Sequence, residues 1–294
     1  MSKKKIIILS IVVVFLIGCA VFLKVLNVAV KYRFARNFRM ESLDKYVSEL
    51  NESIADRVPI IAYHRIVDHD TKVKYFVENE WVNDLDEVEK ELKYLYDNGW
   101  KTITLDNFHS WYLKDTELDK KSFIITVDDG DIEAYYNLLP LLDKYNFDAT
   151  VFVIGSMVPE VTPELNEPDG GKIGEDVINK LREENSHLHF ESHTYGMHNE
   201  KNGKYVLKEL SINEIANDFK SNEKFGFKYL AYPYGYYNND LLAVISSRSD
   251  IKMAFGFYHD SYANRLNYIY EIDRIMITAD TSFDEFKKWF DYVN

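Results

Sequence analysis

The sequence predicts an α/β fold: a (β/α) barrel of seven or eight strands, incomplete or distorted, that follows an N-terminal membrane helix. Three observations predict it. From Pro59 onward, short apolar runs rich in β-branched residues alternate with amphipathic segments, seven or eight times over about 235 residues. Hydrophobic residues make up 46% of the chain, which is enough for a packed core. A separate long apolar run lies near the N-terminus.

Residues 1–30 are predicted to be a membrane anchor or signal. Three lysines precede an apolar run at residues 6–23 that carries no charge, long enough for a helix that spans a bilayer. An uncleaved signal-anchor is the favoured interpretation. The sequence Leu-Ile-Gly-Cys that ends at Cys19 also resembles a lipobox, and a cleaved secretory peptide is the third alternative. Each alternative places the body outside the cytoplasm, so we expect a cell-membrane protein with its main domain outside.

Residues 31–57 are basic and then mixed, and are predicted to form a juxtamembrane stalk, which leaves residues 58–294 as the folded main domain. The expected strands are the apolar runs 60–63, 102–104, 123–127, 150–154, 189–192, 229–231, 253–255 and 275–277. The expected helices have apolar residues three and four apart, at 85–95, 132–145, 176–184, 212–225 and 283–292. Residues 159–174 hold three of the six prolines and are expected to form a loop over one rim.

The charge distribution argues against a nucleic-acid partner. The first 40 residues hold eight of the 35 Lys and Arg and no acid, so all 48 Asp and Glu lie in the remainder. So acidic a body binds nucleic acid poorly, because phosphate contacts need a basic surface. Cys19 is the only cysteine, which excludes an intrachain disulfide and a cysteine-based zinc site. A metal would have to be bound by His and carboxylates.

Catalytic residues of a parallel barrel lie where strands end and the following loops begin. The strand at 123–127 leads directly into Asp128 and Asp129. Two adjacent acids at a strand end point in different directions, so one can bind a metal while the other faces the substrate. The alternative role for an Asp at this place is the N-cap of a helix.

Two histidines five residues apart, His193 and His198, follow the strand at 189–192. On a helix they would diverge by about 140°, so they converge only in a loop after a strand. The alternative is a pair of unrelated surface or outer-shell histidines. His187 and His189 lie earlier in the same segment, and we expect them to be structural rather than an outer shell of a site.

Two further strand ends carry candidate residues. Tyr232 and Tyr234 lie in a Tyr-Pro-Tyr-Gly loop whose backbone amides could face a developing oxyanion. His64 follows the strand at 60–63, where a single histidine is more often structural. One Asp and two His suit Zn²⁺ while leaving a position open for water and substrate. With a spare carboxylate as base and another His as acid, the set predicts a hydrolase of an amide or ester.

Taken together and in this order, the motifs resemble the polysaccharide deacetylase domain (NodB homology, carbohydrate esterase family 4) over residues 58–290. The resemblance is carried by Val-Asp-Asp-Gly at 127–130, His-Thr-x-x-x-His at 193–198 and Tyr-Pro-Tyr-Gly at 232–235. A Tyr-His pair at 63–64, placed before the acidic pair, is similar to the branch that deacetylates poly-N-acetylglucosamine. In that branch the acid histidine comes first.

The resemblance implies a role for each proton-transfer residue. Asp128 is implied to be the base that activates water, and Arg274 is a candidate to orient it by charge pairing. His64 takes the place of the acid that protonates the leaving amine. An amide needs that protonation more than an ester does, so His64 favours N-deacetylation.

The resemblance also implies a cofactor and an oxyanion contact. Asp129, His193 and His198 are implied to bind a divalent metal ion, expected to be Zn²⁺. The loop with Tyr232 and Tyr234 is implied to contact the oxyanion through its backbone.

The function that follows is an N-deacetylase of an extracellular N-acetylglucosamine polymer of the biofilm type. Two alternatives are a peptidoglycan N-acetylglucosamine deacetylase and a non-catalytic carbohydrate-binding protein. The expected partners are the N-acetylated polysaccharide and, through the N-terminal helix, the membrane.

Overall fold

The structure is a computed structural model that describes residues 54–201, 203–258 and 261–291. Among these residues, no helix has both the length and the apolar character needed to cross a membrane. The predicted anchor at 1–30 and nearly all of the predicted stalk lie outside the described residues, so both stay predictions. The last stalk residues are joined to the body, because Ile54 forms a bridge with Asp119.

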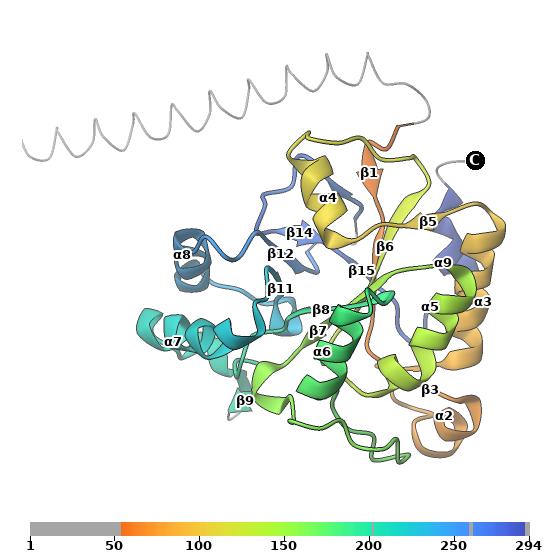
Figure 1. Ribbon diagram of the computed structural model, residues 1–294, viewed down its shortest axis with the longest axis horizontal. Helices are drawn as coiled ribbons and strands as arrows, with labels where there is room; N and C mark the ends of the chain where they lie inside the picture. Colours follow the sequence, from red (N-terminus) through yellow and green to blue (C-terminus); the bar gives the residue numbers. More distant parts are fainter. Residues whose placement is uncertain (1–53, 202, 259–260, 292–294) are drawn as a thin grey trace, which may run out of the picture. The chain divides into compact units, whose positions relative to one another are not determined.

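The main sheet has nine strands, and all of its neighbouring strands run parallel. Their order is β14-β12-β11-β8-β7-β6-β2-β15, with β5 beside β6 (Figure 1). The strands are β2 (Ile60–Tyr63), β5 (Lys101–Thr102), β6 (Ser122–Val127), β7 (Ala149–Val153), β8 (Leu188–Ser192), β11 (Tyr229–Ala231), β12 (Met253–Gly256), β14 (Ile272–Asp273) and β15 (Ile275–Met276).

The sheet closes almost completely into a barrel. β14 and β15 lie at the two ends of the strand order, yet Arg274 alone separates them in the chain. A single segment therefore pairs with β12 on one side and with β2 on the other. The predicted barrel of parallel strands with helices is confirmed.

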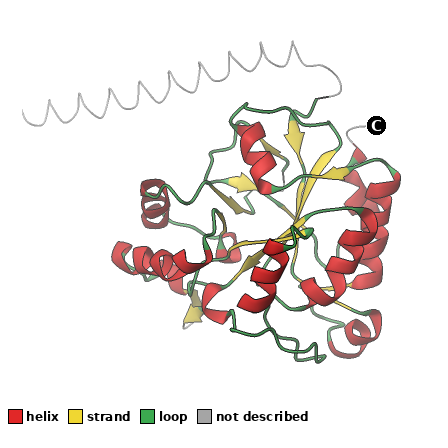
Figure 2. Cartoon of the chain, viewed as in Figure 1, coloured by secondary structure: helices red, strands yellow, loops and turns green. Residues whose placement is uncertain are grey.

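Helices surround the strands (Figure 2). They are α2 (His69–Tyr75), α3 (Leu85–Asp97), α4 (Leu105–Tyr112), α5 (Leu139–Tyr145), α6 (Glu175–Glu183), α7 (Ile212–Asn222), α8 (Asn239–Ser247) and α9 (Phe283–Lys288). Three short pairs lie outside the barrel: β1 (Arg57–Val58) with β13 (Ala263–Asn264), β3 (Arg65–Val67) with β4 (Val82–Asp84), and β9 (Glu200–Lys201) with β10 (Lys204–Tyr205). Reciprocal capping boxes begin α4, α7 and α9.

The barrel core follows from the alternation of side chains along each strand. Ile60, Ile124 and Phe152, from three different strands, belong to one buried cluster and face the interior. Phe108 and Trp111 of α4 join the same cluster, so α4 closes the amino-terminal end of the barrel. The polar residues that follow the strands lie at the opposite end of the barrel, at the carboxyl ends of the strands.

Candidate active site

The interior-facing alternation continues past the ends of two strands. In β6, Ile124 and Thr126 face inward, and Asp128 follows two residues later in the same phase. In β2, Ile60 faces inward, and His64 keeps that phase four residues later. Both side chains therefore lie at the mouth of the barrel.

Asp128 forms a buried, bidentate ion pair with Arg274. Arg274 Nη1 donates to Asp128 Oδ1 at 2.7 Å, and Nη2 donates to Oδ2 at 2.8 Å. Nη1 also reaches Thr126 Oγ1 at 3.2 Å, and the guanidinium lies over the rings of Phe257 and Phe152. Burial alone would raise the pKa of Asp128, but the guanidinium outweighs it and holds that pKa well below its usual range. Asp128 is therefore a carboxylate at any physiological pH.

Asp129 leaves the strand phase because the backbone turns sharply. Its φ is +73°, a left-handed conformation that few residues other than glycine adopt, and Gly130 follows at +76°. A Cβ on Gly130 would lie 2.9 Å from Val153 Cγ1 of the neighbouring strand. The glycine thus permits the close turn, and the turn directs Asp129 away from Asp128.

Asp129 meets two histidines. Its Oδ1 lies 3.5 Å from His193 Nε2 and 3.2 Å from His198 Nε2. His193 Nδ1 lies 2.9 Å from the carbonyl of Ala231, which can only accept, so this nitrogen carries the proton and Nε2 presents its lone pair to Asp129. Burial lowers the pKa of His193 to about 4, so the ring is neutral at physiological pH, as a metal ligand must be.

This set fits a divalent cation. Asp129 Oδ1 is buried and has no hydrogen-bond partner, although two ring nitrogens face it. Tetrahedral ligands with bonds of roughly 2.0–2.2 Å lie about 3.4 Å from one another. The two measured separations from Asp129 Oδ1, 3.2 and 3.5 Å, match that spacing. The three predicted ligands are therefore together in a group that could bind a metal.

The loop that carries the histidines is held by Asp218 of α7. Thr194 has a φ of +68°, and the next two amides, of Tyr195 and Gly196, donate to the two oxygens of Asp218 at 2.8 and 2.7 Å. Burial raises the pKa of Asp218, and these two hydrogen bonds oppose the shift. Sequence reasoning missed this residue, because an Asp in an amphipathic helix is typical of a solvent-facing position.

Tyr234 lies at the cluster, whereas Tyr232 does not. The ring of Tyr234 packs on the ring of His198, with centroids 4.4 Å apart. The ring of Tyr205 stacks on that of Tyr234, with centroids 4.3 Å apart. Tyr232 is buried in the outer core, and its hydroxyl donates to the carbonyl of Tyr270. The Tyr232 amide donates to Phe255, so neither group is free to contact a substrate.

Only one amide of this loop is left for an oxyanion. The amides of Gly235 and Tyr236 close turns onto the carbonyls of Tyr232 and Pro233, and proline has no amide hydrogen. Tyr234 itself has a φ of +57°. Its amide is therefore the candidate oxyanion donor, and the prediction for Tyr232 is corrected.

His64 belongs to the same group of side chains. Its electrostatic interaction with Asp128 acts to lower the pKa of that carboxyl, and His64 Nδ1 is buried without a hydrogen-bond partner. The ring meets Trp81 edge-on, with centroids 5.0 Å apart. The preceding residue, Tyr63, faces outward and donates to Glu91 Oε2 of α3 at 2.6 Å, which fixes the end of β2.

His187 lies immediately before β8 and His189 near its start, away from the cluster at the carboxyl end of the strand. His187 Nδ1 and His189 Nε2 approach the same oxygen of Asp148, at 3.0 and 3.4 Å. They form no outer shell around His193.

The sequence was compared with known proteins. A family profile, described as polysaccharide deacetylase, matches residues 115–249. A poly-beta-1,6-N-acetyl-D-glucosamine N-deacetylase of Staphylococcus aureus strain MRSA252 is 33% identical over 213 residues, which are 68% of this chain and 69% of that protein. The chain belongs to the polysaccharide deacetylase family. The family resemblance and the enzyme class predicted from the motifs are thus confirmed.

Solved structures share the fold of this deacetylase. The deacetylase PplD of Streptococcus pyogenes, solved with acetate, superposes with a TM-score of 0.63 at 20% identity, covering 79% of this chain and 97% of that one. IcaB of Ammonifex degensii gives a TM-score of 0.64 at 19% identity, covering 80% and 97%. Both similarities show a shared fold.

Proposed function

We propose that this deacetylase is a metal-dependent enzyme that removes N-acetyl groups from an extracellular polymer of N-acetylglucosamine, of the poly-β-1,6-linked biofilm type. The observation that carries the proposal is the meeting of Asp129, His193 and His198 beside the Asp128–Arg274 ion pair. The Staphylococcus aureus relative, named for that substrate, supports the choice of polymer.

The ligand set suits Zn²⁺. A divalent cation held by Asp129, His193 and His198 would supply Lewis-acid chemistry, by polarising an acetamide carbonyl and making water more acidic. Asp128 then accepts a proton from the attacking water, while Arg274 holds both of its oxygens in place. The Tyr234 amide donates to the oxygen that becomes negative as the water attacks.

His64 completes the reaction on the leaving side. As the carbon–nitrogen bond breaks, His64 donates a proton to the sugar nitrogen, which leaves as a neutral amine. The acetyl group departs as acetate, which keeps the oxygen from water. One water is consumed for each acetyl group removed, and because the acetic acid ionises to acetate, the released amine takes up one proton and leaves the site as an ammonium, so that atoms and charge balance.

The location belongs to the same proposal. An extracellular polymer requires a catalytic domain outside the cytoplasm, and the apolar run within residues 1–30 supplies an anchor in the cell membrane. Residues 31–57 would then separate the anchor from the catalytic domain at 58–294.

The test is release of free amine and acetate by the purified chain from poly-β-1,6-N-acetylglucosamine and, in parallel, from peptidoglycan. Release from the first polymer, abolished by a chelator and restored by Zn²⁺, is the expected result. Release from peptidoglycan alone would reassign the substrate. No release from either polymer in the presence of Zn²⁺, Mn²⁺ or Co²⁺ would overturn the enzymatic proposal.

A further inference from the structure

Trp81 is an exposed aromatic residue beside the proposed acid. It is 42% exposed, although a tryptophan usually buries most of its surface. The edge-on contact with His64, at an interplanar angle of 62°, is the aromatic contact that fixes its place. An indole therefore stands at the barrel mouth with surface free to meet a ligand.

The segment before Trp81 is held rigidly. Lys72 is buried, and its Nζ donates to the carbonyls of Phe76 and Asn79 at 2.7 and 2.9 Å. The side chain of Asn79 in turn accepts from the Trp81 amide at 3.1 Å. A buried ammonium on two carbonyls of one turn fixes its backbone, so the indole is positioned before any ligand arrives.

Two contacts fasten the same segment to the ends of the barrel strands. The guanidinium of Arg65, the residue after His64, lies over the ring of Phe76 at 4.9 Å from its centroid. The amide of Ala279, in the loop after β15, donates to the carbonyl of Glu80 at 2.9 Å. The segment thus continues the reaction centre rather than forming a separate surface.

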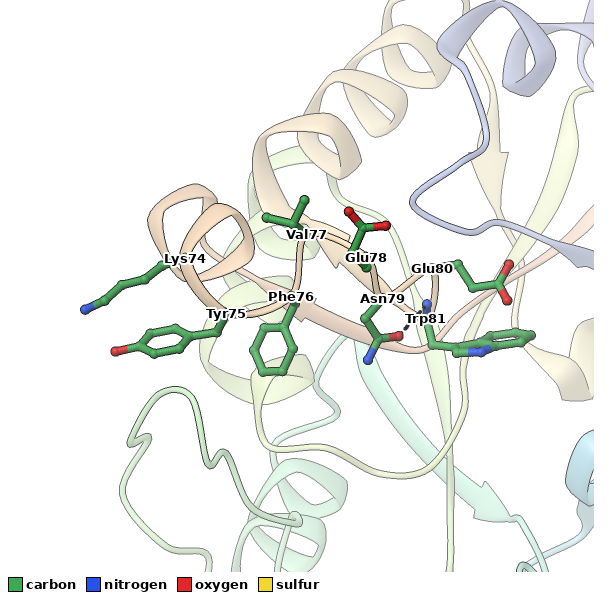
Figure 3. A pocket seen from close by; sticks show the side chains of 8 residues that line it. All are labelled: Lys74, Tyr75, Phe76, Val77, Glu78, Asn79, Glu80 and Trp81. Carbon is green, nitrogen blue, oxygen red and sulfur yellow. Dashed lines mark hydrogen bonds between the residues drawn. The ribbon is translucent and has the colours of Figure 1, made fainter. Parts of the chain in front are cut away.

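A pocket of about 480 Å³ runs along this segment (Figure 3). It is lined by Lys74, Tyr75, Phe76, Val77, Glu78, Asn79, Glu80 and Trp81. The indole of Trp81 extends away from Lys74 and Tyr75 (Figure 3). The volume falls within the roughly 300–1,000 Å³ of pockets that bind small molecules.

The pocket combines the two kinds of group that a sugar ring needs. One face of a pyranose carries C–H groups that pack on an aromatic ring, while its edge carries hydroxyls. The carboxylates of Glu78 and Glu80 and the amide of Asn79 are hydrogen-bonding groups for such hydroxyls. A strongly anionic or wholly apolar ligand would use only part of this surface.

We propose that Trp81 is the stacking platform of a binding site for a neighbouring sugar of the substrate chain, next to the sugar whose acetyl group is removed. The inference rests on the proposed function and adds where the polymer extends: from His64 along residues 74–81. Because the platform touches a sugar other than the reacting one, it acts on binding of oligomers and not on the chemical step.

The test compares Trp81→Ala and Trp81→Phe with wild type in the metal-loaded whole chain. For β-1,6-linked N-acetylglucosamine hexamers, Trp81→Ala should raise KM by about tenfold with little change in kcat, the size expected for one aromatic contact. Trp81→Phe, which keeps a ring, should lose less. A small aryl acetate is the reference substrate, and the ratio of kcat/KM for the hexamer to kcat/KM for the aryl acetate should fall in Trp81→Ala and fall less in Trp81→Phe. Tyr268→Ala, an exposed aromatic on the loop before β14, is the matched control and should leave both substrates unaffected.

Direct binding gives a second measurement. Of the four tryptophans, Trp100 and Trp111 are buried and Trp289 packs on Tyr262, so an added hexamer should alter mainly the emission of Trp81. The change should vanish in Trp81→Phe.

Each outcome separates the two proposals. A wild-type chain that releases no amine from the polymer refutes the proposed function. An active wild type with an unchanged hexamer KM in Trp81→Ala overturns the stacking site. A fall in kcat that is equal for the N-acetylglucosamine dimer and hexamer, with KM unchanged, also overturns it, because Trp81 would then only orient His64.

Discussion

Asp128 has to accept a proton while two hydrogen bonds from Arg274 hold it ionised. The ion pair lowers its basicity but fixes both oxygens, so positioning rather than a near-neutral pKa makes it effective. Asp128→Asn keeps the shape and the three proposed metal ligands. We expect unchanged metal content and a fall in amine release of about 10²–10⁴-fold, measured by metal analysis and steady-state kinetics. Loss of the metal in this variant would contradict the assignment of Asp128 as a base.

His64 is tested by changing the leaving group. An N-acetylated sugar leaves as an amine and needs a proton, whereas an aryl acetate leaves as a stabilised phenolate. His64→Ala should therefore lose about 10²-fold or more on the polymer and far less on the aryl ester. The matched Asp128→Asn variant should lose activity on both substrates. Equal losses of His64→Ala on the two would show that His64 has no acid role.

Strand alternation also explains which residues could be predicted from the sequence. Asp128 and His64 stand in phase with apolar interior residues, so a strand pattern and a following polar residue suffice to place them. Tyr232 was misplaced because its strand neighbour Leu230 faces outward, and residues two apart share a face. Trp81 contacts His64, and Asp218 contacts the Tyr195 amide. Both partners are distant in sequence, so no local sequence pattern predicts these contacts.

Among the elements, α7 supports the metal cluster through Asp218. Its carboxylate accepts from the amides of Tyr195 and Gly196, which directly follow the left-handed Thr194, so these hydrogen bonds hold a strained backbone between the two histidines. Asp218→Asn replaces one acceptor by an NH₂ group that cannot accept from an amide. We expect a 10–100-fold weaker Zn²⁺ affinity in a competition assay, the usual effect of changing a supporting contact. Asn217→Ala, one residue away on the same helix, should bind Zn²⁺ normally.

Helix α3 is joined to β2 by the hydrogen bond from Tyr63 to Glu91, and this contact carries a pH dependence. Burial raises the pKa of Glu91 to about 7 from the ordinary 4.5. A raised carboxyl pKa gives stability that is full below pH 4.5 and is lost as pH rises through 7. The loss amounts to about 3 kcal/mol of the free energy of unfolding. In Glu91→Gln the denaturation midpoint should change less with pH, between pH 4.5 and 7, than it does in wild type. An unaltered pH dependence would show that ionisation of Glu91 does not affect stability.

The element boundaries were predictable where a buried strand imposed its own pattern. β2 and β11 have the predicted bounds, because each is an uninterrupted apolar run. Helices α2, α4 and α8, of seven to nine residues, were not predicted. The strand expected at 275–277 corresponds to β15, which pairs with β2, whereas β14, on the other side of Arg274, was not predicted and pairs with β12.

At the scale of the whole molecule, closure of the barrel and assembly of the reaction centre depend on the same segment. Arg274 lies between β14 and β15, which join the two ends of the sheet, and its side chain enters the barrel over Phe152. The ion pair with Asp128 therefore links the closing segment to the central strand β6. A ligand bound at Asp129, His193 and His198 therefore lies beside the ion pair that links the two ends of the sheet to its central strand.

Metal binding should consequently stabilise the whole domain. A ligand that binds the folded state alone adds about 2.7 kcal/mol when its concentration is 100 times Kd. For a domain of this size each kcal/mol raises Tm by roughly 2–4 °C, so Zn²⁺ should raise Tm by about 5–10 °C over the chelated protein. Calorimetric or fluorescence melting curves with and without a chelator measure this shift.

The variants decide whether the shift arises at the proposed cluster. Asp129→Asn removes the shared carboxylate that lies 3.2 and 3.5 Å from the two ring nitrogens, and should lose most of the Zn²⁺-dependent shift. His189→Ala is the matched control, because His189 also contacts an Asp oxygen but at the start of β8, and it should keep the full shift. If Asp129→Asn melted with an undiminished Zn²⁺ shift, the metal would bind elsewhere, and the stabilisation would have to be traced to another group.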